Sequence, residues 1–342
     1  MAYGYTIYFS CRSNNRVLCW DPDSGRADIL AGEGSPFTQP QQKLKDPYGL
    51  AVDPTGGVII ADKLNNRIVR IKGGTFTVVP TLDREDRSHR TSLRDVGFPV
   101  TPAGLSLEPD GTLLISYSED GTIRRLLPNG TLKVAIGIHP MYNYVLSGCE
   151  EIVPPPRSNY FPINRPTSIA SEGYGHTYFI ERGYQLVRRL DANGVLSCVF
   201  KPNPHISSPP QGVGATVRTS DYAPPFPTSV ALNRHGIVYV ADAAHGCVWE
   251  VDEPNGIARC IGMSDRSGNV KSQAGPAALA FGPDGVLWIL DFGEKRVWGI
   301  RPARPDGTIG QTWKRVVESY AIESLSGLAT KPEGGGIAIR SA

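Results

Sequence analysis

Residues that could do chemistry recur at one position in this chain, directly after a short apolar run. The six residues that follow these runs are Cys11, Asp62, Tyr117, Glu181, Asp242 and Asp291. An aspartate at such a position commonly bonds backbone groups of its own turn, and we expect that structural role for the three aspartates. Cys11, Tyr117 and Glu181 cannot all play the same structural part. The residue at this position therefore differs in type between the repeats, and these differences indicate where a functional site should be sought.

Acid–base chemistry without a metal is the reaction type that these residues favour. His139 or His245 could be the base, because imidazole titrates near neutral pH. Glu181 could be an acid or a base if burial raises its pKa. Tyr117 and Arg182 could hold an enolate or a carboxylate, since fixed donors and a fixed cation stabilise developing negative charge. Such a catalytic set suits a lyase, an isomerase or a cyclase acting on a small molecule.

The elements that must position these residues form a repeat of roughly 40–55 residues. The clearest copy runs from Pro47 to Ile71. Each copy contains a run of small residues, a glycine turn, a continuous apolar run, an alternating run and a short fourth run. Four antiparallel strands in each of six copies, with no helical periodicity, predict an all-β six-bladed β-propeller. We expect residues 1–342 to form a single domain of this kind.

The ends of the chain are expected to meet in one blade. The sequence begins with a second strand at residues 6–9, and residues 325–330 read as a first strand. Pairing the two would close the ring without an exposed sheet edge. A further apolar run at residues 336–339 resembles another second strand and has no place in this scheme.

Two phrases within the clearest copy resemble the NHL repeat. They are Pro47–Asp53, with the sequence PYGLAVD, and Ala61–Ile68, with the sequence ADKLNNRI. Partial matches recur along most of the chain. The resemblance implies a six-bladed propeller but leaves the function open, because propellers of this type include RNA readers, protein scaffolds, lyases and hydrolases.

The mouth of the central channel is the expected place for a ligand. Long loops and the starts of the first strands should share this face, and long ordered loops often carry sites. The loop at residues 137–166 is rich in aromatics and stiffened by prolines, and it could cover the mouth. The residues that we expect to bind substrate are Tyr48, Asp62, Tyr142, Thr167, Thr228, Asp242 and Asp291.

A metal is not expected, although calcium or zinc would change the reaction class. The fold resembles that of calcium-dependent lactonases, and a calcium site would need several oxygen ligands together. Asp62, Glu181, Asp242 and Asp291 are the set that could supply them. Zinc needs about three converging ligands, and the six histidines show no paired spacing. A metal-dependent hydrolase or lactonase therefore remains an alternative to the metal-free enzyme.

Charge and composition restrict the other functional classes. The net charge is +2, and acidic and basic residues nearly cancel on the long-loop face, which disfavours nucleic acid as a partner. A non-enzymatic scaffold that binds a protein partner stays open. No membrane span or signal peptide is recognised, and no C-x-x-C pair occurs among the six cysteines. We therefore expect free thiols and a cytoplasmic location.

Overall fold

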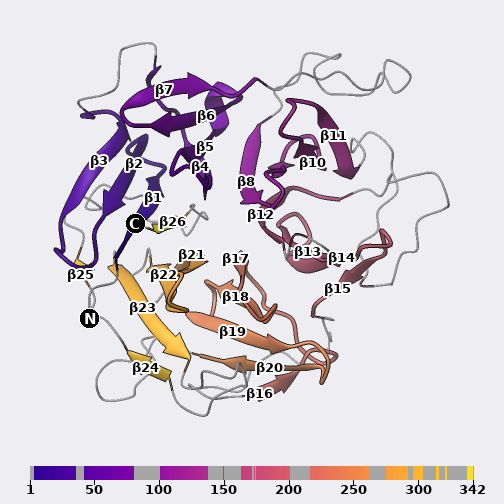
Figure 1. The fold of residues 1–342 in the computed structure, drawn as a ribbon. Coiled ribbons are helices and arrows are strands. Elements are labelled where there is room, and N and C mark those ends of the chain that lie inside the picture. Colours follow the sequence, from indigo (N-terminus) through magenta and orange to yellow (C-terminus); the bar gives the residue numbers. More distant parts are fainter. Residues whose placement is uncertain are drawn as a thin grey trace, which may run out of the picture.

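Six antiparallel sheets surround a central axis in the computed structural model (Figure 1). The structure describes residues 4–35, 42–80, 101–137, 149, 163–171, 173, 175–200, 216–261, 275–291, 296–302, 313–315, 320–321 and 337–341. Each sheet contains a run of four strands from the axis outward. The predicted all-β six-bladed propeller is confirmed. No helix in the described part of the chain is long and apolar enough to cross a membrane.

We number the blades from the N-terminus and give the strands of each from the axis outward. Blade 1 contains β26 (Ile337–Ser341), β1 (Tyr5–Cys11), β2 (Arg16–Trp20) and β3 (Ala27–Gly32). Blade 2 contains β4 (Pro47–Val52), β5 (Val58–Asp62), β6 (Arg67–Lys72) and β7 (Thr75–Val78). Blade 3 contains β8 (Pro102–Leu107), β9 (Leu113–Tyr117), β10 (Thr122–Leu126) and β11 (Leu132–Ile136).

The other three blades follow the same plan. Blade 4 contains β12 (Pro166–Ser171), β13 (Thr177–Glu181), β14 (Leu186–Leu190) and β15 (Leu196–Cys198). Blade 5 contains β17 (Pro227–Leu232), β18 (Val238–Asp242), β19 (Cys247–Asp252) and β20 (Ile257–Cys260), with β16 (Thr216–Arg218) added outside. Blade 6 contains β21 (Pro276–Phe281), β22 (Leu287–Asp291), β23 (Arg296–Pro302) and β24 (Trp313–Arg315), and β25 (Tyr320–Ala321) also pairs with β23.

The ring closes in blade 1, as expected, but through a different segment. β26 pairs antiparallel with β1, with Ile339 opposite Ile7. The inner position that we assigned to residues 325–330 is therefore held by residues 337–341. The apolar run at residues 336–339, which had no place in the predicted scheme, belongs to this closing strand. Residues 325–330 themselves lie outside the described residues. Both segments are apolar and short, so periodicity could not choose between them.

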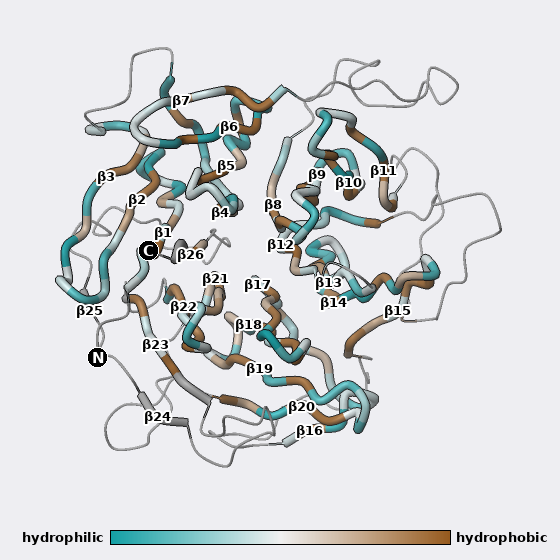
Figure 2. The backbone as a smooth tube through the Cα atoms, viewed as in Figure 1, coloured by the Kyte–Doolittle hydropathy of each residue, from teal (hydrophilic) through white to brown (hydrophobic). Residues whose placement is uncertain are grey.

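The hydrophobic core consists of six clusters, each between two neighbouring blades. In each blade, the strand next to the inner strand is buried along nearly its whole length, because it lies between two such clusters. Figure 2 shows the corresponding hydrophobic segments within the blades. The continuous apolar runs of the sequence are explained by this burial on both faces.

The inner strands approach one another very closely. A Cβ added to Gly104 in β8 would lie 1.9 Å from the backbone oxygen of Thr167 in β12, and one added to Gly49 would lie 2.3 Å from the oxygen of Ala103. Buried hydroxyls complete these contacts. Ser116 Oγ donates to the Thr167 oxygen at 2.6 Å, and Ser10 Oγ donates to the Tyr48 oxygen at 2.7 Å. Small residues in the first run of each repeat therefore reflect contact between blades.

Four of the six cysteines form disulfides, which corrects our expectation of free thiols. Cys149 is joined to Cys198, and Cys247 is joined to Cys260. Cys11 and Cys19 are free, and burial raises the pKa of the Cys11 thiol to about 12. The pairings could not be deduced from spacing, because six cysteines allow many connectivities. The premise of the predicted cytoplasmic location is removed, since disulfides persist mainly in oxidising compartments.

The close approach of the inner strands can be tested at Gly104. Gly104→Ala should lower the free energy of unfolding by about 3 kcal/mol, because the new methyl group overpacks a backbone contact. Gly175→Ala is the control, since a Cβ there meets nothing within 4 Å. The measurement is urea unfolding of both variants. Equal stability of the two variants would show that the inner strands are not in this contact.

The disulfides can be tested by counting reactive thiols. In denaturant without reductant, iodoacetamide should modify two cysteines for each chain, because the other four are oxidised. After reduction, all six should react. Intact mass spectrometry gives both counts. Six modified cysteines before reduction would contradict the pairing.

Candidate functional site

One rim of the propeller carries the starts of the inner strands and the ends of the next strands outward. Pro47 lies opposite Asp62, Pro166 opposite Glu181, and the same pairing recurs in blades 3, 5 and 6. Directly after each proline the register shifts, as in a β-bulge, which places an extra residue at the rim. These extra residues are Tyr48, Ala103, Thr167, Thr228 and Ala277. The two sets of predicted site residues therefore share this rim.

The carboxylates that end the second strands are occupied by local partners. Asp62 accepts from the Lys45 amide at 2.7 Å and from Arg67 Nε at 2.6 Å. Asp291 accepts from the Gly275 amide at 2.9 Å. Each carboxylate thus ties the segment entering its inner strand to the neighbouring strand. The structural role that we expected for the aspartates accounts for these contacts.

Glu181 makes contacts of the same kind in blade 4. It accepts from the Asn164 amide and from Arg188 Nε, both at 2.7 Å, and Arg188 is 1 % exposed. Burial raises the pKa of Glu181, while the Arg188 charge and both hydrogen bonds oppose that rise. The buried Arg188 guanidinium therefore holds the carboxylate in place as a fixed cation.

Tyr117 is also packed against an arginine rather than open to the rim. The Arg124 guanidinium lies 4.9 Å from the centre of its ring, and Arg124 pairs with buried Asp120. Thr228 donates to the Pro276 oxygen at 2.7 Å and so links blades 5 and 6. The roles that we predicted for Tyr117 and Thr228 in a site stay predictions. His139 and Tyr142 lie outside the described residues.

The four carboxylates proposed for a metal are not brought together. Asp62, Glu181, Asp242 and Asp291 belong to four different blades, and each has its own protein partners. Within the described ranges, no three His, Cys, Asp or Glu side chains are grouped as metal ligands would be. These residues do not fit the shared oxygen cage that calcium requires.

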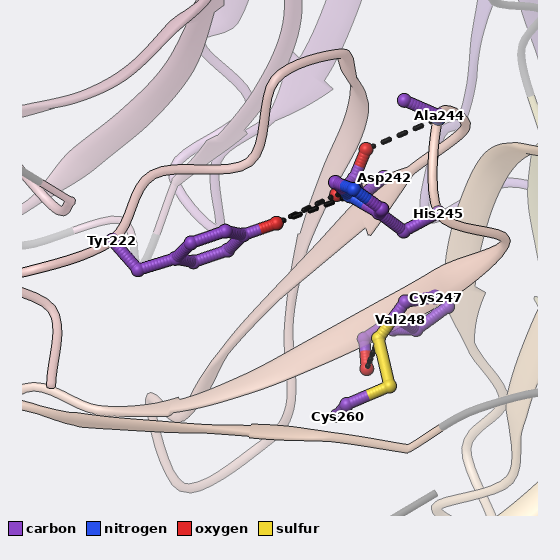
Figure 3. Close-up of a disulfide and its surroundings, with 7 residues drawn as sticks. All are labelled: Tyr222, Asp242, Ala244, His245, Cys247, Val248 and Cys260. Carbon is purple, nitrogen blue, oxygen red and sulfur yellow. Dashed lines mark hydrogen bonds and ion pairs between the residues drawn. A yellow bond between two sulfur atoms is a disulfide. The ribbon is translucent and has the colours of Figure 1, made fainter. Parts of the chain in front are cut away.

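His245 and Asp242 form a pair in blade 5. Nδ1 of His245 lies 2.8 Å from Oδ2 of Asp242, which is fully buried, while the His245 side chain is 33 % exposed. The Tyr222 hydroxyl donates to the same carboxylate oxygen at 3.3 Å. Since an ionised carboxylate only accepts, a hydrogen bond between the two requires the proton on Nδ1, and in that tautomer Nε2 can accept a proton. Figure 3 shows Tyr222 pointing toward this pair.

The same geometry has a counterpart in blade 2. Asn65 stands three residues after Asp62, as His245 stands three after Asp242, and Asn65 Nδ2 donates to Asp62 at 2.8 Å. Histidine preserves this bond and adds a second ring nitrogen that asparagine lacks. The turn that carries His245 is fixed on its outer side, because Cys247 is joined to Cys260 in the neighbouring strand (Figure 3).

A second group of residues gathers around Tyr48 in blade 2. Its side chain is buried, and Thr167 of blade 4 lies near enough to its hydroxyl to lower the pKa that burial raises. The Arg12 guanidinium lies 4.8 Å and the Lys63 ammonium 5.5 Å from the centre of its ring. The structure therefore brings together the predicted residues Tyr48 and Thr167 across three blades.

Arg182 belongs to the same group, and two further members were not among our predicted site residues. The Arg182 charge acts on Tyr48 and on Lys63, and its guanidinium lies 5.6 Å from the centre of the Phe226 ring. Arg12, Lys63 and Arg182 occupy the same position, immediately after the second strand of their blades. Aligning the position that follows Cys11, Asp62 and Glu181 would have found them.

Comparison with known proteins supports the fold and leaves the activity open. No family model matches the chain, so the NHL likeness remains one of sequence phrases. A streptogramin B lyase structure is 17 % identical, with a TM-score of 0.52, and covers 97 % of this chain and 83 % of its own. A putative gluconolactonase is also 17 % identical, with a TM-score of 0.52. The match covers 93 % of this chain and 86 % of the gluconolactonase chain. The structural neighbours thus include propeller enzymes of lyase and lactonase type.

The sequence relatives are parts of much longer proteins. Mouse teneurin-1 is 21 % identical over 289 residues, which is 78 % of this chain, and mouse teneurin-4 is 24 % identical over 303 residues, which is 75 %. The chain spans about a tenth of the length of these curated relatives. The likeness indicates a related segment within them.

The buried ion pair of blade 4 can be tested with two adjacent arginines. Arg188→Met should lower the free energy of unfolding by about 3–5 kcal/mol, because it leaves the Glu181 carboxylate buried without its cation. Arg189→Met is the control, since Arg189 is 34 % exposed and its pair with Glu253 should contribute under about 1 kcal/mol. Urea unfolding at neutral pH measures both. Equal losses would contradict a structural role for the pair.

Proposed function

We propose that this chain is a small-molecule enzyme that uses acid–base chemistry of the lyase or isomerase type at the rim carrying His245. The observation that supports it most is the His245–Asp242 pair. A buried carboxylate on Nδ1 fixes the ring and stabilises it once Nε2 has taken a proton, which is the arrangement of a general base. The partial exposure of His245 leaves that base accessible to a ligand.

The neighbouring groups supply the other requirements of such a reaction. Burial and the Asp242 charge raise the pKa of Tyr222, so its phenol stays protonated and keeps the carboxylate oriented. Arg182 stacks on Phe226, whose oxygen accepts from the Ala243 amide in the His245 turn. In this proposal His245 removes a proton from carbon, and Arg182 stabilises the negative charge that develops. The charge collapses by expelling a leaving group in a lyase, or by reprotonation in an isomerase.

Two alternatives are each favoured by a specific observation. Lactone hydrolysis is favoured by the gluconolactonase neighbours, and it could use the same histidine to activate water. A protein-interaction module is favoured by the teneurin match, because a propeller carried within a much longer protein can serve as a binding surface. The cytoplasmic location has lost its premise, and a single domain over residues 1–342 remains a proposal.

The experiment compares three forms of residue 245. Quinupristin is the lyase probe, and D-glucono-1,5-lactone is the lactonase probe, following the ligands and activities named for the neighbours. His245→Asn is expected to reduce kcat at least about 100-fold, because general-base catalysis contributes on that order. His245→Asn should keep the stability of the parent protein, since Asn65 makes the same bond in blade 2. His245→Ala should lose both activity and stability.

The outcomes separate the proposals. Lyase turnover that disappears in His245→Asn supports the acid–base enzyme. Turnover that persists in a well-folded His245→Asn protein would exclude His245 as the base. Turnover of neither probe, together with saturable binding of a protein partner at the same rim, would favour the interaction module.

A further inference from the structure

Four cations lie at the part of the rim formed by blades 1, 2 and 4, in addition to the arginines that pair with the buried carboxylates of Asp62 and Glu181. Arg12 and Lys63 approach the same Tyr48 ring, and Arg182 is close enough to act on both Tyr48 and Lys63. Arg165 stands just before the inner strand of blade 4. The cations come from four separate segments of the chain, so only the fold brings them together.

Two carboxylates partly balance these charges. Asp46 bonds Arg12 through both oxygens, at 2.6 and 3.0 Å, and its Oδ2 lies 3.9 Å from Lys63 Nζ. Glu119 lies 3.5 Å from Arg165 in an exposed pair. Among the described residues Arg182 has no ion pair. The cluster therefore keeps an excess positive charge centred on Lys63 and Arg182.

The excess charge is only partly screened by water. Arg12 and Lys63 have side chains that are 13 % and 18 % exposed. Burial lowers the pKa of Lys63, and the charges of Arg12 and Arg182 add to this effect while Asp46 and Glu119 oppose it. Gathering like charges in a half-buried place is unfavourable unless a negative charge completes it.

The backbone at the cluster is also unusual. Asp46 and Arg165 both precede the proline of an inner strand, and both adopt a left-handed conformation, with φ of 52° and 53°. That conformation is uncommon for a bulky residue and costs free energy, of order 1 kcal/mol. It is found here at equivalent positions of two blades, and both side chains join the charge cluster.

We propose that this cluster is an oxyanion site, which binds the carboxylate or phosphate group of a small molecule through Lys63, Arg182 and the Tyr48 hydroxyl. Burial raises the pKa of Tyr48, so its phenol is available as a neutral donor. A guanidinium, an ammonium and a phenol together offer several donors, which suits the several acceptors of one oxyanion. Arg12 and Asp46 act as positioning residues that hold Lys63 and the Tyr48 ring.

This inference rests on the proposed function in one respect: it takes the bound anion to be a group of the enzyme's substrate. Arg182 would then belong both to the anion site and to the reacting centre. A substrate that carries a carboxylate or phosphate would place that group at this cluster, whereas the neutral D-glucono-1,5-lactone of the activity test would leave it unused. Binding itself needs no turnover, so it can be measured whether or not the reaction is found.

The experiment measures binding of inorganic phosphate and of malonate by calorimetry at low salt, with glycerol as the neutral control. The intact protein should bind at least one of the two anions and not glycerol, and added chloride should weaken the binding. Tighter binding of phosphate would identify a phosphate group, and tighter binding of malonate would identify a carboxylate. Binding of neither anion would overturn the proposal.

Charge-neutral variants locate the site. Lys63→Gln and Arg182→Gln should each weaken binding about tenfold or more, because each removes a charge-assisted hydrogen bond. Arg26→Gln is the matched control, since Arg26 is highly exposed and lies in the β2–β3 turn, at the opposite end of blade 1. Without anion, Lys63→Gln and Arg182→Gln should unfold at a midpoint no lower than that of the parent, because charge repulsion is relieved. Equal binding by all three variants would overturn the assignment.

His245→Asn separates this inference from the proposed function. The variant should bind the anion as tightly as the parent protein while lacking lyase turnover. Loss of turnover with anion binding retained supports both proposals. Failure of anion binding in the intact protein overturns the oxyanion site alone, because the activity of the histidine is measured separately.

Discussion

The close approach of neighbouring inner strands is the constraint on which the rest of the structure depends. At Gly49 and Gly104 the backbones are so near that a single methyl group would collide with the next blade. Hydroxyls of Ser10 and Ser116 then satisfy backbone groups that would otherwise be buried without partners. These contacts draw the inner strands of blades 1 to 4 together around the axis.

That constraint explains why the rim can vary without loss of the fold. The buried carboxylates of Asp62, Glu181 and Asp291 bind the segments that enter the inner strands, and they serve the scaffold. The residue after each second strand is less constrained, although Ser118 donates to the Pro166 oxygen at 2.8 Å and Arg12 bonds Asp46. This residue is Arg12, Lys63, Ser118, Arg182 or Ala243 in the first five blades. Individual chemistry is therefore located one residue beyond the position where the repeat is most constrained.

Much of the scaffold could be predicted from the sequence because strand periodicity and glycine turns are local signals. The repeat in blade 2 and the burial of Val58–Asp62 on both faces follow from such signals. The disulfides, the closing strand β26 and the approach of Thr167 to Tyr48 could not be predicted in this way. Each joins segments far apart in the chain, and composition carries no information on which distant segments meet. The Asp242–His245 pair could have been predicted from the sequence, because its members are only three positions apart.

The closure of the ring through β26 has a consequence for how the protein is made. Phe9 pairs with Ile337, so blade 1 is assembled from segments about 330 residues apart. During synthesis β1, β2 and β3 must wait, with the inner edge of their sheet unpaired, until nearly all the other blades have emerged. Such late pairing of distant segments is slow and leaves an edge exposed to aggregation. The last step of folding is therefore expected to be the capture of one five-residue strand, and a chaperone that shields the edge of β1 would act at that step.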